Sequence, residues 1–209
     1  MKTLFVIGDS ISIQYGPALR AMVEGSYVYD RKGARGPEDT DLDRPAQMNG
    51  GDSARVLEYV CERDAEGFWK PGMVLLLNCG LHDIKTDPAT GKVQVEIADY
   101  QRNLRAVFEL MQRRGVEGVW VRTTPVEDAR HNDRPGMAFH RFNRDTIAYN
   151  ETADALVAEF GWYSIDLYGF SERLIAWLGA DEVYVDHVHF SERVHGLQAA
   201  YLCGALAKL

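Results

Sequence analysis

The sequence lacks the long apolar run that a membrane-spanning helix requires. Such a helix needs about 20 apolar residues, and polar or charged residues interrupt every apolar segment of this 209-residue chain well before that length. Positive charge is also in deficit, because 23 Lys and Arg face 31 Asp and Glu, which gives a net charge of −8. An acidic surface repels nucleic-acid phosphates and anionic lipids. We therefore expect neither nucleic acid nor a membrane as a partner.

Cysteine is scarce, and its arrangement argues against a disulfide framework. The chain has three cysteines and no C-x-x-C pair, whereas small disulfide-built domains carry an even number of cysteines. An apolar segment follows directly on Met1–Thr3 and leaves no room for a signal peptide. Reduced thiols and the missing signal together predict a cytoplasmic protein.

The chain instead shows a regular alternation of apolar, β-rich segments with amphipathic ones. The strands that we expect are Thr3–Ile7, Ser26–Tyr29, Met73–Leu77, Gly118–Arg122 and Tyr163–Leu167. The helices that we expect are Gly16–Glu24, Ser53–Arg63, Ile97–Arg114, Phe139–Phe160, Phe170–Leu178 and Ser191–Leu209. Strands separated by helices imply right-handed crossovers and a sheet covered on both faces. We predict an α/β fold, a single three-layer αβα domain over residues 1–209 with a flavodoxin-like, mainly parallel five-stranded sheet.

Two segments have the composition of long surface loops, Asp30–Asn49 and Thr124–Ala138. Long loops at the carboxyl edge of such a sheet often contact substrate. Arg130 and Arg134 in the second loop are therefore candidate substrate contacts, and together with Arg141 they allow an acidic substrate such as a uronate. A solvated run of charges is the simpler interpretation, and we favour it.

Ser10 occupies the point where the first expected strand turns towards a helix. The run Leu4–Ile7 has the pattern of a buried strand, and Gly8 and Asp9 end it. A serine there lies at the carboxyl end of a strand, where open α/β sheets bind their ligands. It also lies beside the N–H groups of a helix start, which favour negative charge. Ser10 is thus either a helix N-cap or a nucleophile.

Near the other end of the chain, Asp186 and His189 stand in a D-x-x-H segment. A serine nucleophile needs a histidine within hydrogen-bonding reach and a carboxylate that fixes the tautomer of that histidine. One short loop can supply both groups. Taken alone, the segment is also consistent with an ordinary polar loop, or with half of a metal site formed by Asp186, His187 and His189.

Gly8-Asp9-Ser10 and Asp186-x-x-His189 together resemble the SGNH (GDSL-type) hydrolase family. Two further blocks stand in the order that the family has, Asn49-Gly50-Gly51-Asp52-Ser53 and Asn78-Cys79-Gly80-Leu81-His82-Asp83. Smaller matches are Thr123–Pro125, Ala148–Asn150 and Ile165–Leu167. The resemblance covers essentially the whole chain, and four ordered blocks are far more specific than any one of them.

The resemblance implies a catalytic triad of Ser10, Asp186 and His189 that transfers an acyl group to water through an acyl-enzyme, with no cofactor and no metal. It also implies an oxyanion hole made by Ser10, Gly51 and His82. The family has an asparagine at the position of His82, but a histidine ring N–H can also donate a hydrogen bond. We therefore expect a variant active site that still functions.

Asp9 and Asp83 lie inside these blocks and are further candidate substrate contacts. Asp83 has two alternative roles, since it can hold the His82 ring or cap the following turn. Cys79 stands at a strand end, where a buried cysteine usually serves as a small hydrophobic residue rather than as a nucleophile.

We expect a serine esterase that removes short acyl groups, acetyl above all, from a carbohydrate or another small alcohol. Its partner is then a small-molecule ester, and its activity rises through the neutral pH range because the histidine must be neutral to act as a base. A thioesterase or lysophospholipase with the same triad is one alternative. The others are a binding protein without activity, and a metal-dependent phosphoesterase built on Asp9, Asp186, His187 and His189.

Overall fold

The first strand, β1 (Lys2–Ile7), is an inner strand of the sheet because its apolar run is buried on both faces. Residues Leu4–Ile7 are each at most 2% exposed in the computed structural model, which describes residues 1–33, 42, 44–45 and 47–209. Continuous burial of this kind is typical of parallel sheets covered on both sides. β1 pairs with β2 (Tyr27–Arg31) on one side and with β3 (Val74–Leu77) on the other.

Within the described residues the sheet has five strands in the order β2-β1-β3-β4-β5, and every pairing is parallel. Its last two strands are β4 (Glu117–Val121) and β5 (Tyr163–Ile165). This order is that of flavodoxin-like sheets, in which ligands bind beyond the carboxyl ends of the strands. The predicted α/β fold is confirmed, and the sheet is parallel throughout.

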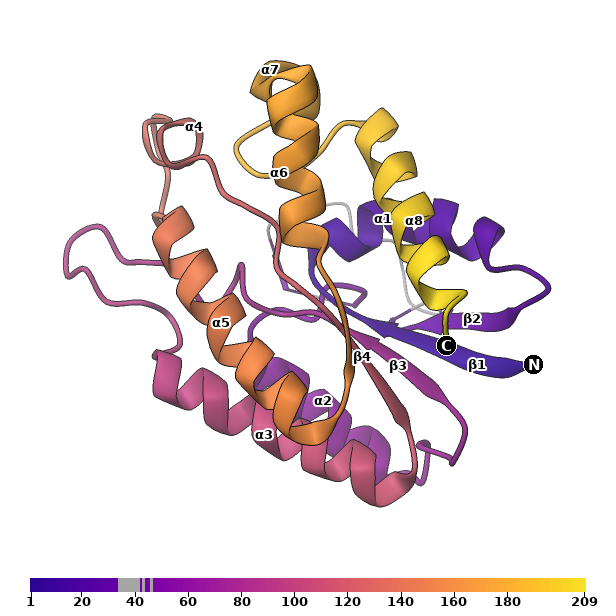
Figure 1. Cartoon of the computed structure of the whole chain (residues 1–209). Helices are drawn as coiled ribbons and strands as arrows, with labels where there is room; N and C mark the ends of the chain where they lie inside the picture. Colours follow the sequence, from indigo (N-terminus) through magenta and orange to yellow (C-terminus); the bar gives the residue numbers. More distant parts are fainter. Residues whose placement is uncertain (34–41, 43, 46) are drawn as a thin grey trace.

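Two layers of helices cover the sheet (Figure 1). Their bounds are α1 (Ser10–Met22), α2 (Ser53–Ala65), α3 (Ile97–Arg114), α4 (Asp128–Asn132), α5 (Asn143–Phe160), α6 (Leu167–Leu178), α7 (Ala180–Val183) and α8 (Glu192–Leu206). On one face α8 packs against α1 and α6, and on the other face α3 packs against α2 and α5. In the described part of the chain, no helix has the length and apolar character needed to cross a membrane.

The start of α1 differs from the sequence prediction, and the difference places Ser10. We expected a helix from Gly16, but α1 begins at Ser10. The cause is Asp9, whose carboxylate accepts a hydrogen bond from the Ile11 N–H at 3.0 Å and so caps the helix immediately after the strand. The nucleophile candidate therefore lies on the first turn of a helix.

Two other segments differ from the expectation. α5 begins at Asn143 rather than at Phe139, because the backbone of His140 pairs with that of Thr86 through two hydrogen bonds of 2.8 Å. The expected loop Thr124–Ala138 contains the short helix α4. Both differences arise from contacts that local sequence patterns do not reveal.

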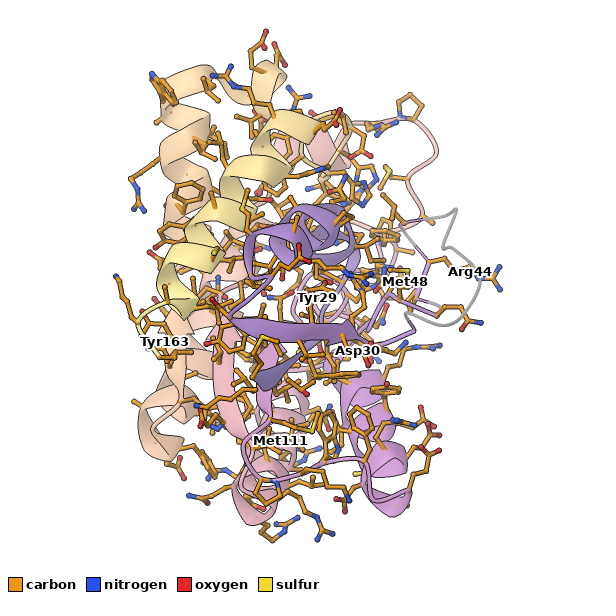
Figure 2. All side chains as sticks on the ribbon, turned by 90° about the vertical axis from the view of Figure 1, so that its right-hand side faces the viewer. Tyr29, Asp30, Arg44, Met48, Met111 and Tyr163 are labelled. Atoms are coloured by element: carbon orange, nitrogen blue, oxygen red, sulfur yellow. The ribbon has the colours of Figure 1, made fainter. Side chains whose placement is uncertain are left out.

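The expected loop Asp30–Asn49 lies partly outside the described residues, since positions 34–41, 43 and 46 are not described. Its first two residues, Asp30 and Arg31, are the end of β2 rather than loop. Figure 2 shows β2 at the edge of the sheet beneath α1, with Tyr29 and Asp30 on it.

Candidate active site

Ser10 lies where β1 ends and α1 begins. Asp9 is the N-cap of α1, so the interpretation of Ser10 as the cap is wrong. Asp9 is only 1% exposed, and burial raises the pKa of its carboxyl group. The Ser10 N–H belongs to the first turn of α1, whose N–H groups have no acceptor within the helix. Asp9 therefore has a structural role, and Ser10 retains both its hydroxyl and its N–H for chemistry.

His189 joins Ser10 to Asp186. The His189 Nε2 lies 3.0 Å from Ser10 Oγ, and its Nδ1 lies 2.6 Å from Asp186 Oδ2. Because a carboxylate accepts hydrogen bonds, Nδ1 carries the proton and Nε2 is free to accept the proton of the Ser10 hydroxyl. The two ends of the chain thus bring together a hydroxyl, an imidazole and a carboxylate in the order that base-assisted nucleophilic attack requires.

The Asp186 carboxylate is held by its own loop. Its Oδ1 accepts hydrogen bonds from the N–H groups of Val188 and His189, both at 2.8 Å. Burial acts to raise the pKa of Asp186, but the His189 ring and these two N–H groups outweigh it and hold the pKa below its usual range. Asp186 is therefore charged at neutral pH, where it can hold the His189 ring.

The loop that carries Asp186 and His189 is closed at its base. The Val185 N–H donates to the His189 carbonyl at 2.9 Å, and the Ser191 N–H donates to the Val183 carbonyl at 2.8 Å. Stacked rings of Tyr184 and Phe190, with centroids 4.9 Å apart, fill the space between the two arms. The catalytic loop is thus a small hairpin that ends where α8 begins.

Gly51, the predicted oxyanion donor of the second block, lies in a turn tied to the strand end before Ser10. The Gly50 N–H donates to the Gly8 carbonyl at 2.8 Å. Gly51 itself has a φ of +71°, in the left-handed region that favours glycine. Its N–H donates to Asn49 Oδ1 at 2.9 Å. The N–H that was expected to face an oxyanion therefore already has an acceptor within the protein, and sequence reasoning left Asn49 without a role.

The third block forms the turn after β3, which is the neighbour of β1. Gly80 is required there, because a Cβ at its position would lie 2.3 Å from Thr123 Oγ1 and its φ is +154°. His82 follows in this turn and is 2% exposed. Because β1 and β3 end at the same edge of the sheet, this turn and the first turn of α1 lie in the same region of the fold.

Asp83 makes a contact that the sequence did not suggest. It is fully buried, and its Oδ1 accepts a hydrogen bond at 2.8 Å from the N–H of Ser53, the first residue of α2. Burial raises the pKa of Asp83 to about 7. Asp83 therefore caps a helix that is distant in sequence and connects the third block to the second.

The smaller sequence matches hold the strand ends in place. Thr123 and Asn150 exchange two hydrogen bonds, from the Thr123 N–H to Asn150 Oδ1 at 2.8 Å and from Asn150 Nδ2 to the Thr123 carbonyl at 2.9 Å. The Thr123 hydroxyl donates to the Cys79 carbonyl at 3.0 Å.

The Cys79 thiol is buried, which raises its pKa well above the ordinary value and keeps it protonated. Cys79 is therefore unsuited to act as a nucleophile.

The arginines of the Thr124–Ala138 segment lie at the surface. Arg130 forms ion pairs with Glu127, at 2.8 Å, and with Asp181. Arg134 is exposed. For Arg130, these contacts agree with a solvated cluster of charges. Within the described part of the chain, neither arginine forms a hydrogen bond with Ser10, Asp186 or His189.

Arg141 behaves differently and lies beneath the third block. It is 2% exposed, its Nε donates to the Leu81 carbonyl at 2.6 Å, and its Nη1 donates to His131 Nε2 at 3.0 Å. His131 must then carry its proton on Nδ1, which lies 3.1 Å from Asn132 Oδ1. The His131 ring packs edge-on against His187 at 4.7 Å. No motif indicated this buried group, because its members come from separate parts of the chain.

Asp186, His187 and His189 also offer donor atoms within 4.8 Å of one another, the spacing that a metal ion requires. One donor atom of Asp186 and one of His189 already bond to each other at 2.6 Å. A metal ion bound through those two atoms would replace the proton between them. Metal binding and the serine–histidine arrangement are thus alternatives at this loop.

Comparison with known proteins agrees with this geometry. The family model described as GDSL-like Lipase/Acylhydrolase matches residues 4–202. A search of curated protein sequences finds no match.

Solved structures show the same fold at low sequence identity. A member of the lipolytic protein G-D-S-L family from Veillonella parvula has a TM-score of 0.70 and 17% identity, with 100% of both chains covered. The lipase/acylhydrolase from Enterococcus faecalis has a TM-score of 0.69 and 16% identity, covering 100% of this chain and 96% of that one. The acetyl xylan esterase AlAXEase has a TM-score of 0.70 and 16% identity, covering 98% and 99%. These likenesses show the fold, and the match of the family model over nearly the whole sequence shows more: the chain belongs to the GDSL-like lipase/acylhydrolase family.

Proposed function

We propose that the protein is a serine esterase that hydrolyses short-chain acyl esters, acetyl esters above all, of a carbohydrate or another small alcohol. The observation that carries the proposal is the 3.0 Å contact between His189 Nε2 and Ser10 Oγ, with Asp186 bound to the other ring nitrogen at 2.6 Å. Membership of a family of lipases and acylhydrolases supports the reaction class.

In the proposed reaction, Ser10 Oγ attacks the ester carbonyl carbon while its proton passes to His189 Nε2. Asp186 stabilises the imidazolium that forms. His189 then gives the proton to the alcohol oxygen, the carbon–oxygen bond breaks, and the acyl group remains on Ser10. Water attacks this second ester, loses a proton to His189, and releases the acid and free Ser10.

The tetrahedral intermediate carries a negative oxygen, for which we propose the N–H groups of Ser10 and Gly51 and the ring of His82 as donors. The Gly51 N–H is bonded to Asn49 Oδ1 at 2.9 Å, so it has to share that bond with the substrate oxygen or exchange it. Asn49 Oδ1 thus accepts the Gly51 N–H when no substrate is bound and keeps that N–H oriented between turnovers.

An acetyl ester is proposed as substrate because one structure with this fold is an acetyl xylan esterase. Lipases, and thioesterases or lysophospholipases that act on long acyl chains, need a long apolar groove, so the dependence of turnover on acyl length separates them from a short-chain esterase.

The test is hydrolysis of p-nitrophenyl acetate, butyrate and octanoate by the wild type and by Ser10→Ala, each with and without a chelator. We expect turnover that falls with acyl length, resists the chelator, and drops at least about 10³-fold in kcat/KM in the variant. Ser164→Ala removes an exposed serine on β5 and is the matched control. Turnover that survives Ser10→Ala but is lost with chelator would favour the metal-dependent alternative, and a preference for octanoate would favour a lipase.

A further inference from the structure

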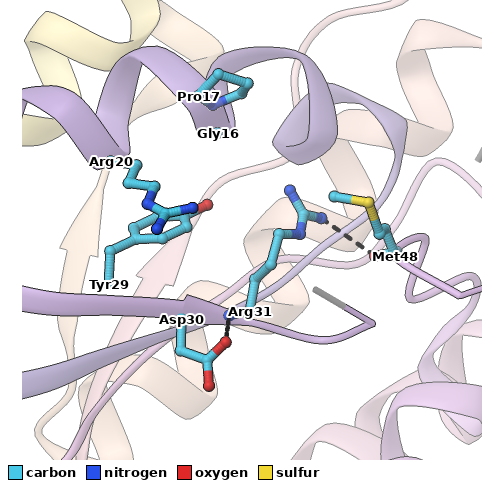
Figure 3. A pocket seen from close by; sticks show the side chains of 7 residues that line it. All are labelled: Gly16, Pro17, Arg20, Tyr29, Asp30, Arg31 and Met48. Atoms are coloured by element: carbon cyan, nitrogen blue, oxygen red, sulfur yellow. Dashed lines mark hydrogen bonds between the residues drawn. The ribbon is translucent and has the colours of Figure 1, made fainter. Parts of the chain in front are cut away.

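Arg31, at the end of the edge strand β2, is a buried guanidinium with three hydrogen bonds near the active site. The residue is only 5% exposed. Its Nη1 donates to the Ser12 carbonyl at 2.9 Å, and its Nη2 donates to Ser12 Oγ and to the Met48 carbonyl, both at 3.1 Å. Figure 3 shows the guanidinium between α1 and the segment at Met48. The family motifs do not include Arg31, and the proposed triad does not use it.

The Ser12 hydroxyl connects the Arg31 guanidinium to the peptide unit between Asp9 and Ser10. It donates to the Asp9 carbonyl at 2.7 Å. That carbonyl and the Ser10 N–H belong to the same peptide unit, which is planar and conjugated. A continuous chain therefore runs from the guanidinium of Arg31 through the Ser12 hydroxyl and the Asp9–Ser10 peptide to the N–H that faces the proposed oxyanion.

Arg31 is also connected, through the Met48 carbonyl, to the turn that carries Gly51, the other proposed backbone donor. Met48, whose carbonyl accepts from Arg31, immediately precedes Asn49, and Asn49 Oδ1 accepts the Gly51 N–H at 2.9 Å. A single guanidinium thus fixes the distance between the first turn of α1 and the turn that carries Gly51. These are the two segments that supply the proposed backbone donors.

Two glycines leave the space that this arrangement needs. A Cβ at Gly8 would lie 2.8 Å from both Cβ and Oγ of Ser12, so any side chain at position 8 would displace the Ser12 hydroxyl. A Cβ at Gly16 would lie 3.0 Å from Arg31 Nη1 and 3.0 Å from the Tyr29 hydroxyl. The close packing explains the glycine of the Gly8-Asp9-Ser10 block, which the triad alone does not.

We propose that Arg31 and Ser12 are positioning residues that orient and polarise the Ser10 N–H for the oxyanion, with Arg31 also setting the position of the Gly51 turn. The proposal rests on the esterase function proposed above. Hydrogen bonds in a chain polarise one another in a medium of low dielectric constant, and a charged donor at one end strengthens the effect. The Ser10 N–H is therefore a stronger donor when Arg31 and Ser12 are both present.

The experiment compares kcat, KM and the melting temperature of the wild type with those of Ser12→Ala, Arg31→Gln and the double variant. Removing an oxyanion donor outright costs about 10²–10³-fold in kcat, so weakening one is expected to cost about 10-fold, with KM unchanged within about twofold. The double variant should lose little more than Arg31→Gln, because both changes interrupt one chain. Arg20→Ala is the matched control, since Arg20 lines the same cavity but is exposed.

A chemical rescue separates polarisation from simple structural support. Arg31 borders a cavity of about 440 Å³ beside Gly16 and Tyr29, which gives small ions access to its position. Guanidinium at low, non-denaturing concentration should restore part of kcat in Arg31→Ala but none in Arg31→Ala combined with Ser12→Ala. Arg31→Lys, which keeps the positive charge, is the substitute if Arg31→Ala does not fold, and its kcat should lie between those of the wild type and Arg31→Gln.

The outcomes distinguish this proposal from the function on which it rests. If the wild type hydrolyses no ester, the esterase proposal fails and this one with it. If the wild type is active and folded Ser12→Ala and Arg31→Gln keep its kcat, or lose only melting temperature, the positioning roles are wrong and the esterase proposal stands. Strictly additive losses in the double variant would also contradict a single chain.

Discussion

The two sides of the active site are built in different ways. On the base side, Asp186 and His189 lie in one hairpin, and the bonds that orient them run within residues 183–191. On the oxyanion side, the proposed donors come from three segments that end β1, precede α2 and follow β3. Buried polar groups from elsewhere in the fold, among them Arg31 and Asp83, hold these segments together.

The base side is therefore robust, whereas the oxyanion side is sensitive to changes elsewhere in the fold. A hairpin that orients its own histidine needs only to be packed against α1 to present the base. An oxyanion side assembled from distant segments depends on groups that are costly to bury and that respond to substitution and to pH. A substitution can therefore impair one side while leaving the other intact.

The largest effect is expected from Asp186→Asn on the base side. Without a carboxylate opposite Nδ1, His189 loses the group that fixes its tautomer and stabilises its charged form, and we expect kcat to fall about 10²–10⁴-fold with KM nearly unchanged. Steady-state kinetics with p-nitrophenyl acetate measure this.

The pH dependence of protein stability tests the role of the Asp186 carboxylate independently of activity. Because the folded state lowers the pKa of Asp186, its contribution to stability is present above the pKa of the unfolded chain and is lost as the pH falls through the folded value. Asp186→Asn should thus be less stable than the wild type at pH 7 and should approach it at acid pH.

In the kinetic test of Asp186→Asn, a loss of kcat under about tenfold would mean that another group orients the imidazole.

A smaller effect is expected from changes at His82, on the oxyanion side. His82→Ala removes a proposed donor and should lower kcat about 10²–10³-fold, whereas His82→Asn supplies a neutral donor and should remain within about tenfold of the wild type. The pair of variants is compared at one pH with the same ester. If His82→Asn is as inactive as His82→Ala, the imidazole does more than donate a hydrogen bond.

The smallest effect on activity, and a clear one on stability, is expected from Asp83→Asn. Burial raises the pKa of Asp83 to about 7, so its contribution favours the folded state below the pKa of the unfolded chain and is lost as the pH rises towards and through 7. Asparagine keeps an acceptor for the Ser53 N–H without the charge. We expect the variant to be more stable than the wild type at pH 8, by up to about 4 kcal/mol, and the difference to shrink towards pH 4.

Thermal melts from pH 4 to pH 8 test this, with Asp87→Asn as the control. Asp87 is an exposed carboxylate whose pKa is lowered by the N–H groups of Thr90 and Ala89. Its contribution to stability is lost only below the ordinary pKa of an aspartate, so the stability difference between Asp87→Asn and the wild type should stay nearly constant from pH 4 to pH 8. Parallel curves for Asp83→Asn and the wild type would show that Asp83 does not titrate in this range.

Much of the fold, and the grouping of Asp186 with His189, could be predicted from local patterns in the sequence. The pairing of this loop with Ser10 was predicted from the resemblance of the ordered blocks to a family. The alternation of strands and helices indicated the sheet, and D-x-x-H placed Asp186 and His189 in one loop. The support of the oxyanion side could not be predicted, because Arg31 meets Ser12 through folding alone and stands in no motif. Asp83 was visible in a motif, yet its partner, the Ser53 N–H, depends on how α2 packs.

The bond between His189 and Ser10 joins residues 179 positions apart, and this has a consequence for the order of synthesis. Ser10 is synthesised before His189, which lies 179 positions later in the chain. At about 5–20 residues per second, the two are separated by on the order of 10–40 s. During that interval β1, α1 and the oxyanion segments can fold around a serine that has no base. On the proposed function, a nascent chain gains esterase activity only when the hairpin that carries His189 emerges.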